Sequence, residues 1–138
     1  MPKSTETTIR VRFADTDADG GVFHANYITY FSIGRHDFFN QMGVPQTKLV
    51  AEDHVRPTVI EVTCTFRAVA HFDDVLTVRT TFERMGNKSI TYVYEIVRKE
   101  DAHSETIIAS GSTIQVFLDS SGATVPIPDK VRTAFEGE

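Results

Sequence analysis

The hydrophobic pattern at the start of the chain changes its period once. Residues 8–13 alternate between polar and apolar side chains, which predicts a strand with Ile9, Val11 and Phe13 on one face. After this stretch the apolar residues recur at helical spacing, as Tyr27, Tyr30, Phe31, Gly34, Phe38 and Met42. We expect a helix that is capped by Asn26 and ended by Gly43 and Pro45. Its broad aromatic stripe indicates a helix that is largely enclosed, and Gly34 in mid-helix indicates that a sheet passes close to it.

Strand patterns dominate the rest of the chain. Residues 44–56 have the character of a loop or a short helical turn, and four alternating stretches follow at 58–71, 75–83, 89–99 and 106–118. The first of them places Ile60, Val62, Cys64 and Phe66 on one face. Short connections make neighbouring strands antiparallel, and a short amphipathic tail at 131–135 follows the last one. We therefore expect an α+β fold in which an antiparallel sheet wraps around one helix.

The other face of this predicted sheet also carries apolar side chains. They are Val75, Val93, Val97, Ile107 and Phe117. A monomer would leave much of this surface exposed to water, so the pattern predicts a homo-oligomer.

Composition narrows the class of protein. A chain of 138 residues is long enough for one buried core, and we expect a single domain over residues 1–138. The net charge of -5 and the lack of a basic run argue against a nucleic-acid binder. No apolar run approaches the ~20 residues of a membrane span, so no membrane partner is expected. The single cysteine, Cys64, fits a core position and a cytoplasmic location.

An acidic loop stands between the predicted first strand and the predicted helix. Asp15, Asp17 and Asp19 alternate along it, and Gly20-Gly21 follow. This order brings carboxylates close to the backbone N–H groups that open a helix. Such a site can hold a polarised carbonyl group beside a base. We expect Asp15 to organise the loop through hydrogen bonds to nearby N–H groups.

Calcium binding is the alternative interpretation of this loop. The stretch from Asp15 to Gly20 resembles the first half of an EF-hand loop, and Val22 fits the apolar eighth position. The twelfth position, however, is Asn26 and not glutamate, and the preceding residues have the pattern of a strand. These departures favour a site without a metal.

The loop and the helix together resemble the hotdog-fold acyl-CoA thioesterases of the 4-hydroxybenzoyl-CoA thioesterase type. The resemblance rests on Arg12-Phe13, Asp15-Thr16-Asp17, Gly20, Val22, Phe23 and Asn26-Tyr27, and it extends over residues 8–132 with the segments 66–76, 86–89 and 126–128 as weaker matches. It implies a five-stranded antiparallel sheet around one long central helix. It also implies an acyl-CoA substrate, a cytoplasmic homotetramer built as a dimer of dimers, and no metal or cofactor.

The resemblance also implies roles for particular residues. Asp17 would be the catalytic base or nucleophile of thioester hydrolysis. Substrate or oxyanion contacts would come from the helix start and a later loop, that is from Phe23, His24, Ala25, Asn26, Tyr27, His71 and Phe72. Coenzyme A needs cations for its phosphates, and the candidates flank a predicted turn at Arg84, Lys88 and Ser89. For His24 and His71 an ordinary structural or solvated role stays open, and Asn26 and Tyr27 also fit a cap and the core.

Three positions depart from the pattern of the family. Val69 stands where proline is usual, Asp73 stands where glycine is usual, and the helix has Ser32-Ile33-Gly34-Arg35 where relatives commonly carry a glutamate before the small residue and the arginine. These differences bear on the substrate more than on the reaction. The alternative function is a non-catalytic acyl-CoA or acyl-carrier binding module on the same fold. A dehydratase of this fold fits less well, because His24 has no evident acidic partner.

Overall fold

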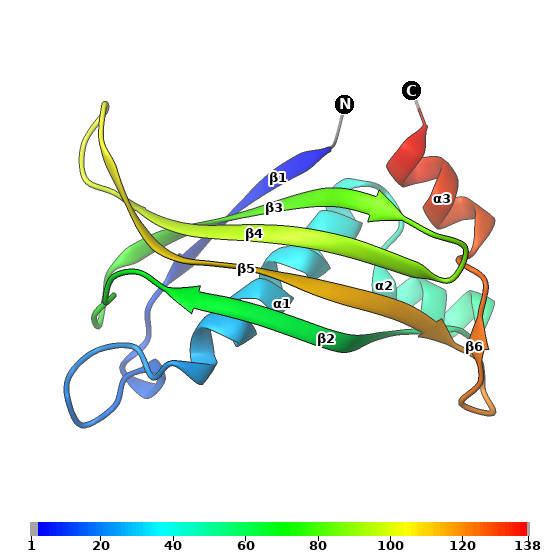
Figure 1. The fold of residues 1–138 in the computed structure, drawn as a ribbon, viewed down its shortest axis with the longest axis horizontal. Coiled ribbons are helices and arrows are strands. Elements are labelled where there is room, and N and C mark those ends of the chain that lie inside the picture. Colours follow the sequence, from blue (N-terminus) through cyan, green and yellow to red (C-terminus); the bar gives the residue numbers. More distant parts are fainter. Residues whose placement is uncertain (1–2, 138) are drawn as a thin grey trace.

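The computed structural model describes residues 3–137 as an antiparallel sheet that curves around one long helix, α1 (Ala25–Gln41) (Figure 1). The long strands are β1 (Ser4–Arg10), β2 (Arg56–Phe66), β3 (Val75–Met85), β4 (Ser89–Lys99) and β5 (Glu105–Leu118). They are ordered β1-β3-β4-β5-β2, and the short strand β6 (Thr124–Val125) pairs with β5. This arrangement confirms the predicted α+β hotdog fold with five long strands and one central helix. No helix of the described residues is long and apolar enough to span a membrane.

The aromatic stripe of α1 packs against the concave face of the sheet, as its spacing predicted. Tyr27, Phe31 and Phe38 are buried, and the Phe31 ring stacks on that of Tyr94 in β4 at a centroid distance of 4.5 Å. The predicted N-cap was wrong by two residues, because the helix begins at Ala25 after His24. Asn26 lies inside the first turn and donates from Nδ2 to the carbonyl of Asp15 at 2.8 Å. Gly43, with φ of +84°, follows the helix at its other end as expected.

Two glycines allow the helix and the sheet to approach closely. A Cβ atom on Gly34 of α1 would lie 2.6 Å from Thr80 Oγ1 and 2.7 Å from Val78 Cγ1 in β3. A Cβ atom on Gly111 of β5 would overlap the carbonyl oxygen of Thr63 and lie 2.7 Å from the Phe31 ring. The predicted close passage of a sheet at Gly34 is therefore confirmed, and Gly111 is its counterpart on the sheet.

Replacing Gly111 with alanine is expected to destabilise the protein. The added methyl group meets backbone on one side and a buried ring on the other, so the core must shift, at a cost of about 2–3 kcal/mol. Urea unfolding followed by circular dichroism measures this loss. The matched control is Gly86→Ala in the β3–β4 turn, where the nearest atom lies 3.5 Å from the new Cβ. An equal midpoint for both variants would contradict this account of the helix–sheet contact.

Shorter elements close the ends of the sheet. A 3-10 turn covers Phe13–Asp15, α2 covers Gln46–Lys48, and a π-helical turn covers Leu49–Asp53. The predicted C-terminal helix is α3 (Asp129–Glu136), and its buried residues are Val131 and Phe135. The Phe135 ring packs edge-on against Phe38 of α1 with centroids 5.0 Å apart.

The strands differ most from the predictions at three points. β1 begins at Ser4 and ends at Arg10, so Phe13 lies in the 3-10 turn and is 77% exposed instead of sharing a strand face with Val11. β2 ends at Phe66, because residues 67–74 form the loop that leads to β3. A shift of the β2–β5 register between Val59 and Glu61 leaves Ile60 without a partner. Val59, not Ile60, therefore shares the inner face with Val62.

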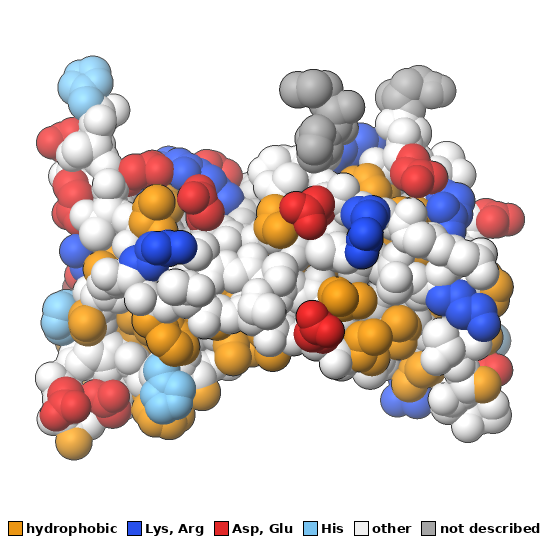
Figure 2. Space-filling view, viewed as in Figure 1, with side chains coloured by type: hydrophobic (Ala, Val, Ile, Leu, Met, Phe, Trp, Pro, Cys, Tyr) orange, Lys and Arg blue, Asp and Glu red, His pale blue; other side chains and the backbone are white. Residues whose placement is uncertain are grey.

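The prediction for the outer sheet face was wrong for two of its five residues. Val97 and Phe117 are fully buried, and only Val75 and Ile107 of the predicted set are strongly exposed, at 43% and 39%. Figure 2 shows this face from outside, with a centre that is mostly neither charged nor hydrophobic and hydrophobic groups gathered towards its lower margin. Arg79 of β3 forms ion pairs with Glu6 of β1, Glu95 of β4 and Glu105 of β5, and these pairs cover part of the sheet. The outer face therefore gives little support for an oligomer contact.

Candidate active site

The acidic loop lies against the loop that joins β2 to β3. The backbone N–H of Val11 donates to the carbonyl of Asp74, and that of Val22 donates to the carbonyl of Ala70, both at 2.8 Å. The Phe13 and Phe72 rings meet edge to face with centroids 5.9 Å apart. The structure thus brings the segment of Asp17 together with the segment of His71 and Phe72, although these lie some fifty residues apart in the chain.

Asp15 organises the acidic loop, as its sequence position predicted. Its buried carboxylate accepts hydrogen bonds from the backbone N–H of Arg12 at 3.0 Å, from Arg12 Nη2 at 2.7 Å and from the Tyr30 hydroxyl at 2.9 Å. Burial alone would raise the pKa of Asp15, but the hydrogen bonds and charge of Arg12 and the bond from Tyr30 outweigh burial and lower it. The Tyr30 pKa is raised by burial and by this same contact. Asp15 is therefore an ionised structural anchor, and sequence reasoning had not identified Tyr30 as its partner.

Asp17 occupies the tip of the loop and is exposed. Its Oδ1 accepts a hydrogen bond from the backbone N–H of Asp19 at 2.9 Å, and its own N–H donates to the carbonyl of Gly21 at 2.9 Å. These bonds fix the turn but leave Oδ2 without a partner among the described residues.

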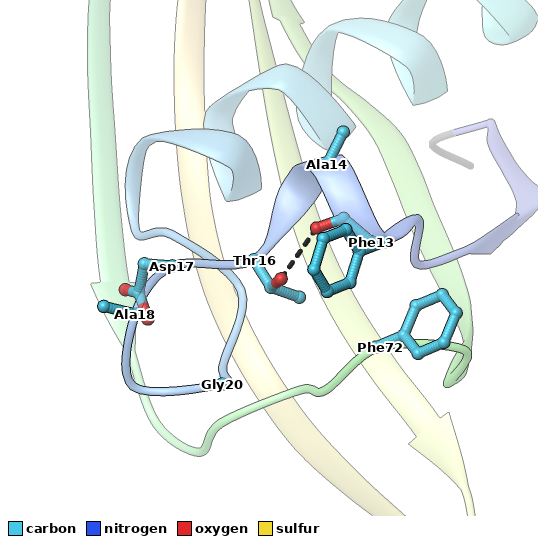
Figure 3. A pocket seen from close by; sticks show the side chains of 7 residues that line it. All are labelled: Phe13, Ala14, Thr16, Asp17, Ala18, Gly20 and Phe72. Atoms are coloured by element: carbon cyan, nitrogen blue, oxygen red, sulfur yellow. Dashed lines mark hydrogen bonds between the residues drawn. The ribbon is translucent and has the colours of Figure 1, made fainter.

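A surface cavity of about 640 Å³ lies beside this loop and is lined by Phe13, Ala14, Thr16, Asp17, Ala18, Gly20 and Phe72. Figure 3 shows that the Asp17 side chain leaves the loop on the side away from the Phe13 and Phe72 rings. The dashed bond in that view runs from Thr16 Oγ1 to the carbonyl of Phe13, 2.7 Å long, and holds the 3-10 turn. The Asp17 carboxylate is therefore not directed at the aromatic end of this cavity.

The start of α1 has two backbone N–H groups without an acceptor. The N–H of Phe23 donates to the carbonyl of Asp15 at 2.9 Å, that of Asn26 to Phe23 at 2.8 Å, and that of Tyr27 to His24 at 3.3 Å. In the part of the chain that the structure describes, no backbone acceptor is found for the N–H of His24 or Ala25. Of residues 23–27, which were predicted to contact the substrate or its oxyanion, only His24 and Ala25 therefore have a backbone N–H without an acceptor among the described residues, and the oxyanion role itself stays a prediction.

Aromatic rings surround this helix start. The exposed His24 ring lies 4.4 Å from that of Phe23 and 6.0 Å from that of Phe66 at the end of β2, measured between centroids. Tyr27 is buried, its hydroxyl accepts from the backbone N–H of Ala70 at 3.2 Å, and burial raises its pKa. Tyr27 therefore belongs to the core, whereas Phe23, His24 and Phe66 form a surface beside the free N–H groups.

The calcium alternative does not fit the geometry. A strand and a 3-10 turn precede the loop, where an EF-hand requires a helix. The Asp15 carboxylate is occupied by Arg12 and Tyr30. Among residues 3–137 no group of three or more histidine, cysteine, aspartate or glutamate side chains is placed to hold a metal ion.

The loop from Arg67 to Asp74 contains the two departures from the family pattern noted above. Asp73 has φ of +73°, a left-handed conformation that glycine adopts more readily, which explains why glycine is usual there. Its carboxylate forms an exposed ion pair with Arg10, 3.1 Å long. Val69 packs against Gly21, where a Cβ atom would lie 2.5 Å from Val69 Cγ1. His71 is exposed and donates its backbone N–H to Asp74 Oδ2 at 2.9 Å.

The three candidate coenzyme A residues lie at the other end of the sheet. Arg84 and Ser89 flank the β3–β4 turn that carries Lys88, and ten residues of β3, about 33 Å, separate this turn from the loop beside Asp17. Figure 1 shows the β3–β4 turn next to α3 and β6, far from the acidic loop. One chain therefore does not bring these residues to its own Asp17.

Cys64 lies at the inner face of β2, half-buried, and burial raises its pKa. It pairs with Gly111 across the β2–β5 ladder and packs against the hydrophobic core. This position agrees with the predicted core role.

Comparison with known proteins assigns the family. The thioesterase-like superfamily matches residues 11–135. The chain belongs to this superfamily. The acyl-CoA thioesterase YbgC of Haemophilus influenzae is 27% identical over 129 residues, which cover 92% of this chain and 90% of the relative. The family assignment confirms the predicted resemblance and the predicted class of enzyme, a thioester hydrolase.

Solved structures of the family agree with the fold. The structure of a gentisyl-coenzyme A thioesterase is 30% identical, with a TM-score of 0.83 and coverage of 96% of this chain and all of that chain. A mutant 4-hydroxybenzoyl-CoA thioesterase, solved in complex with 4-hydroxybenzoyl-CoA, is 22% identical and superimposes with a TM-score of 0.87 over 95% of this chain and 98% of that one. The second likeness supports the fold alone.

Proposed function

We propose that this protein hydrolyses acyl-CoA thioesters at the junction of the acidic loop and the start of α1. The observation that carries the proposal is the pair of free N–H groups at His24 and Ala25, which open α1 a few residues after the exposed Asp17. A thioester carbonyl oxygen bound there accepts two hydrogen bonds at the positive end of the helix dipole. The names of the relatives, thioesterases of acyl-CoA substrates, support the same reaction.

The proposed chemistry uses only groups of this chain, a water molecule and the substrate. Asp17 either takes a proton from water, which then attacks the acyl carbon, or attacks that carbon itself. In the first route the carbon–sulfur bond breaks as the oxyanion collapses, and the thiolate takes up the proton that Asp17 removed from water. In the second route the same cleavage leaves an anhydride between the acyl group and Asp17, and water then hydrolyses this anhydride, releases the acid and restores the Asp17 carboxylate. Both routes consume one water molecule and give a carboxylic acid and free coenzyme A. Each N–H donor to the oxyanion would contribute about 3 kcal/mol of barrier stabilisation.

A screen of acyl-CoA hydrolysis tests the function. Aromatic, short-chain and long-chain acyl-CoAs are incubated with the protein, and the released thiol is measured. We expect turnover with at least one class. Binding of acyl-CoA by calorimetry without turnover of any of them would instead favour the non-catalytic binding module.

We further propose that a second copy of the chain pairs along β2 and completes the site. β2 is an edge strand, bonded only to β5, and its exposed inner face carries Val59, Val62 and Phe66, at 36%, 40% and 50%. Unpaired edges with apolar side chains favour association with another strand. Because Arg84, Lys88 and Ser89 lie far from the Asp17 of their own chain, they would serve the site of another copy. A dimer of dimers and a cytoplasmic location stay predictions from the sequence.

Substituting Val62→Glu on β2 is expected to shift the protein to monomers and to lower hydrolysis at least tenfold. A charge at this inner position would be buried by the second copy, which is costly. Light scattering after size-exclusion chromatography measures the mass. The control is Val75→Glu, an equally exposed valine of β3, 43% exposed, which is expected to keep the wild-type mass. Unchanged mass and activity of Val62→Glu would exclude pairing along β2.

A further inference from the structure

Arg35 of α1 is a buried cation with an incomplete set of hydrogen bonds. Its side chain and backbone together are only 8% exposed. Nη1 donates to the Tyr94 hydroxyl at 3.1 Å and Nη2 to Ser32 Oγ at 3.3 Å. Nε is buried and has no acceptor among the described residues. On the Nε–Nη2 edge, which matches the two oxygens of a carboxylate, Nε therefore has no acceptor and Nη2 has only the Ser32 hydroxyl.

Arg35 differs from the other arginines of the described residues because it is both buried and without an ion pair to a carboxylate. Arg10, Arg12, Arg79, Arg98 and Arg132 each contact an aspartate or a glutamate. Arg56, Arg67 and Arg84 have no such partner in residues 3–137, but they are exposed, so water solvates their charge. Burying an unpaired charge is unfavourable, and a conformation that buries Arg35 is stabilised when an anion binds there.

The position of Arg35 connects it to the proposed site of hydrolysis. His24, Ile28 and Ser32 follow one another at intervals of four residues, so they lie along one flank of α1. On the sheet, Tyr94 bonds to Thr113, and Thr113 pairs with Val62 of β2. The His24 end of the same flank meets Phe66. The flank of α1 and the inner face of β2 therefore run side by side from the free N–H groups to Arg35.

The distance from the free N–H groups to the Arg35 end of this flank is similar whether it is measured along the helix or along the strand. From Ala25 to Ser32 the helix rises about 10 Å, at about 1.5 Å per residue. From Phe66 to Val62 the strand extends about 13 Å, at about 3.3 Å per residue. The side chains between these ends are apolar or weakly polar, namely Ile28 on the helix and Cys64 on the strand. An acyl chain held by its thioester at the helix start would reach Arg35 with its far end.

We propose that Arg35 and Ser32 bind the terminal carboxylate of the acyl group, so that the substrates are medium-chain thioesters with a carboxylate at the end opposite coenzyme A. This inference rests on the proposed function and specifies its substrate class. Arg35 supplies the Nε–Nη2 edge and Ser32 a hydroxyl donor, while Ile28, Val62 and Cys64 contact the methylene chain. Shorter dicarboxylic acyl groups do not span the distance and gain nothing from Arg35.

The test compares substrates of equal chain length that differ in the terminal group. Suberyl-CoA is measured against octanoyl-CoA, and succinyl-CoA against butyryl-CoA. The wild type is expected to prefer suberyl-CoA over octanoyl-CoA by about 10–100-fold in kcat/KM, because hydrogen bonds to a charged group are worth this much. No corresponding preference for succinyl-CoA is expected. A wild type that hydrolyses octanoyl-CoA as well as or better than suberyl-CoA overturns the inference.

The variants Arg35→Gln and Ser32→Ala test whether these two residues cause the preference for suberyl-CoA. Arg35→Gln is expected to lower the ratio of suberyl to octanoyl kcat/KM at least tenfold, and Ser32→Ala, on the exposed side, by a few-fold. Lys130→Gln, which removes a surface charge on α3, is expected to leave the ratio unchanged. Circular dichroism verifies folding, and if Arg35→Gln does not fold, the wild-type preference and Ser32→Ala decide. An unchanged ratio in both folded variants overturns the inference.

If the proposed hydrolase function is wrong, the result differs from the one expected when only the substrate class is wrong. In that case none of the four thioesters is hydrolysed, and the substrate class is judged from calorimetric titration with suberyl-CoA and octanoyl-CoA. Tighter binding of suberyl-CoA that Arg35→Gln abolishes supports the role of Arg35, and equal binding contradicts it.

Discussion

Asp17→Asn is expected to lower kcat for thioester hydrolysis by about 10³-fold, while the fold is retained. Asparagine cannot take a proton from water and is a poor nucleophile. It nevertheless keeps an oxygen that can accept the hydrogen bond from the backbone N–H of Asp19, which fixes the turn. The loss should therefore appear in turnover and not in the unfolding midpoint. Release of free thiol measures the activity, and urea unfolding measures the stability.

Asp19→Asn is the matched control for this experiment. Asp19 belongs to the same exposed loop, and its carboxylate makes no hydrogen bond to the described residues. The change removes the same charge from the loop, so it accounts for any general electrostatic effect on substrate binding. Near-normal turnover of Asp17→Asn, or an equal loss in both variants, would remove Asp17 from the proposed mechanism.

Asp15→Ala is expected to reduce the free energy of unfolding by about 2–3 kcal/mol at neutral pH. The change leaves the buried Tyr30 hydroxyl and the Arg12 N–H without their acceptor, and unsatisfied buried donors are costly. The exposed Arg12 guanidinium is solvated by water in the variant, so the loss of its ion pair with Asp15 adds little to the destabilisation. Urea unfolding measures the difference. Asp19→Ala, an exposed position in the same loop, should stay within about 0.5 kcal/mol of wild type.

The destabilisation by Asp15→Ala should depend on pH in one direction. The folded protein lowers the pKa of Asp15, so its carboxylate stabilises the fold fully above the pKa of an ordinary aspartate, about 3.9. This contribution is lost as the pH falls through the lower pKa of the folded state. The gap in stability between wild type and variant should therefore be constant near neutrality and narrow below about pH 4. A gap that widens in acid would contradict the role of Asp15 as an ionised anchor.

Local periodicity was sufficient to predict most of the fold. β4 has the predicted bounds, and the long helix and the tail helix lie where their apolar spacing placed them. Ile60 was assigned to the inner face because strict alternation continues through a strand, whereas the structure shifts the register beside it. Phe117 was assigned to the outer face by the same rule, but it lies in the core. Bulges depend on pairing with a neighbouring strand, so alternation within one strand does not reveal them.

The sequence predicted which segments form the candidate site but not the hydrogen bonds between them. The alternation of acidic residues before a helix predicted the loop, and the family resemblance gave Asp17 its catalytic role, which stays a prediction. Which N–H groups remain free depends on the carbonyl of Asp15 and on the first turn of the helix, and only the folded loop shows this. Arg35 had a signal in the sequence, a charged residue beside the aromatic stripe of an enclosed helix. The sequence does not show whether a carboxylate pairs with Arg35, and only the structure shows that none of the described residues provides one.

The close contact of α1 with the sheet at Gly34 and Gly111 fixes the distance between the two ends of the proposed site. Backbone and ring atoms fill the space in which the helix would have to slide. The protein should therefore be selective for the length of the acyl chain. Selection for another chain length, in nature or in the laboratory, would act through the volume of the side chains at positions 28 and 62.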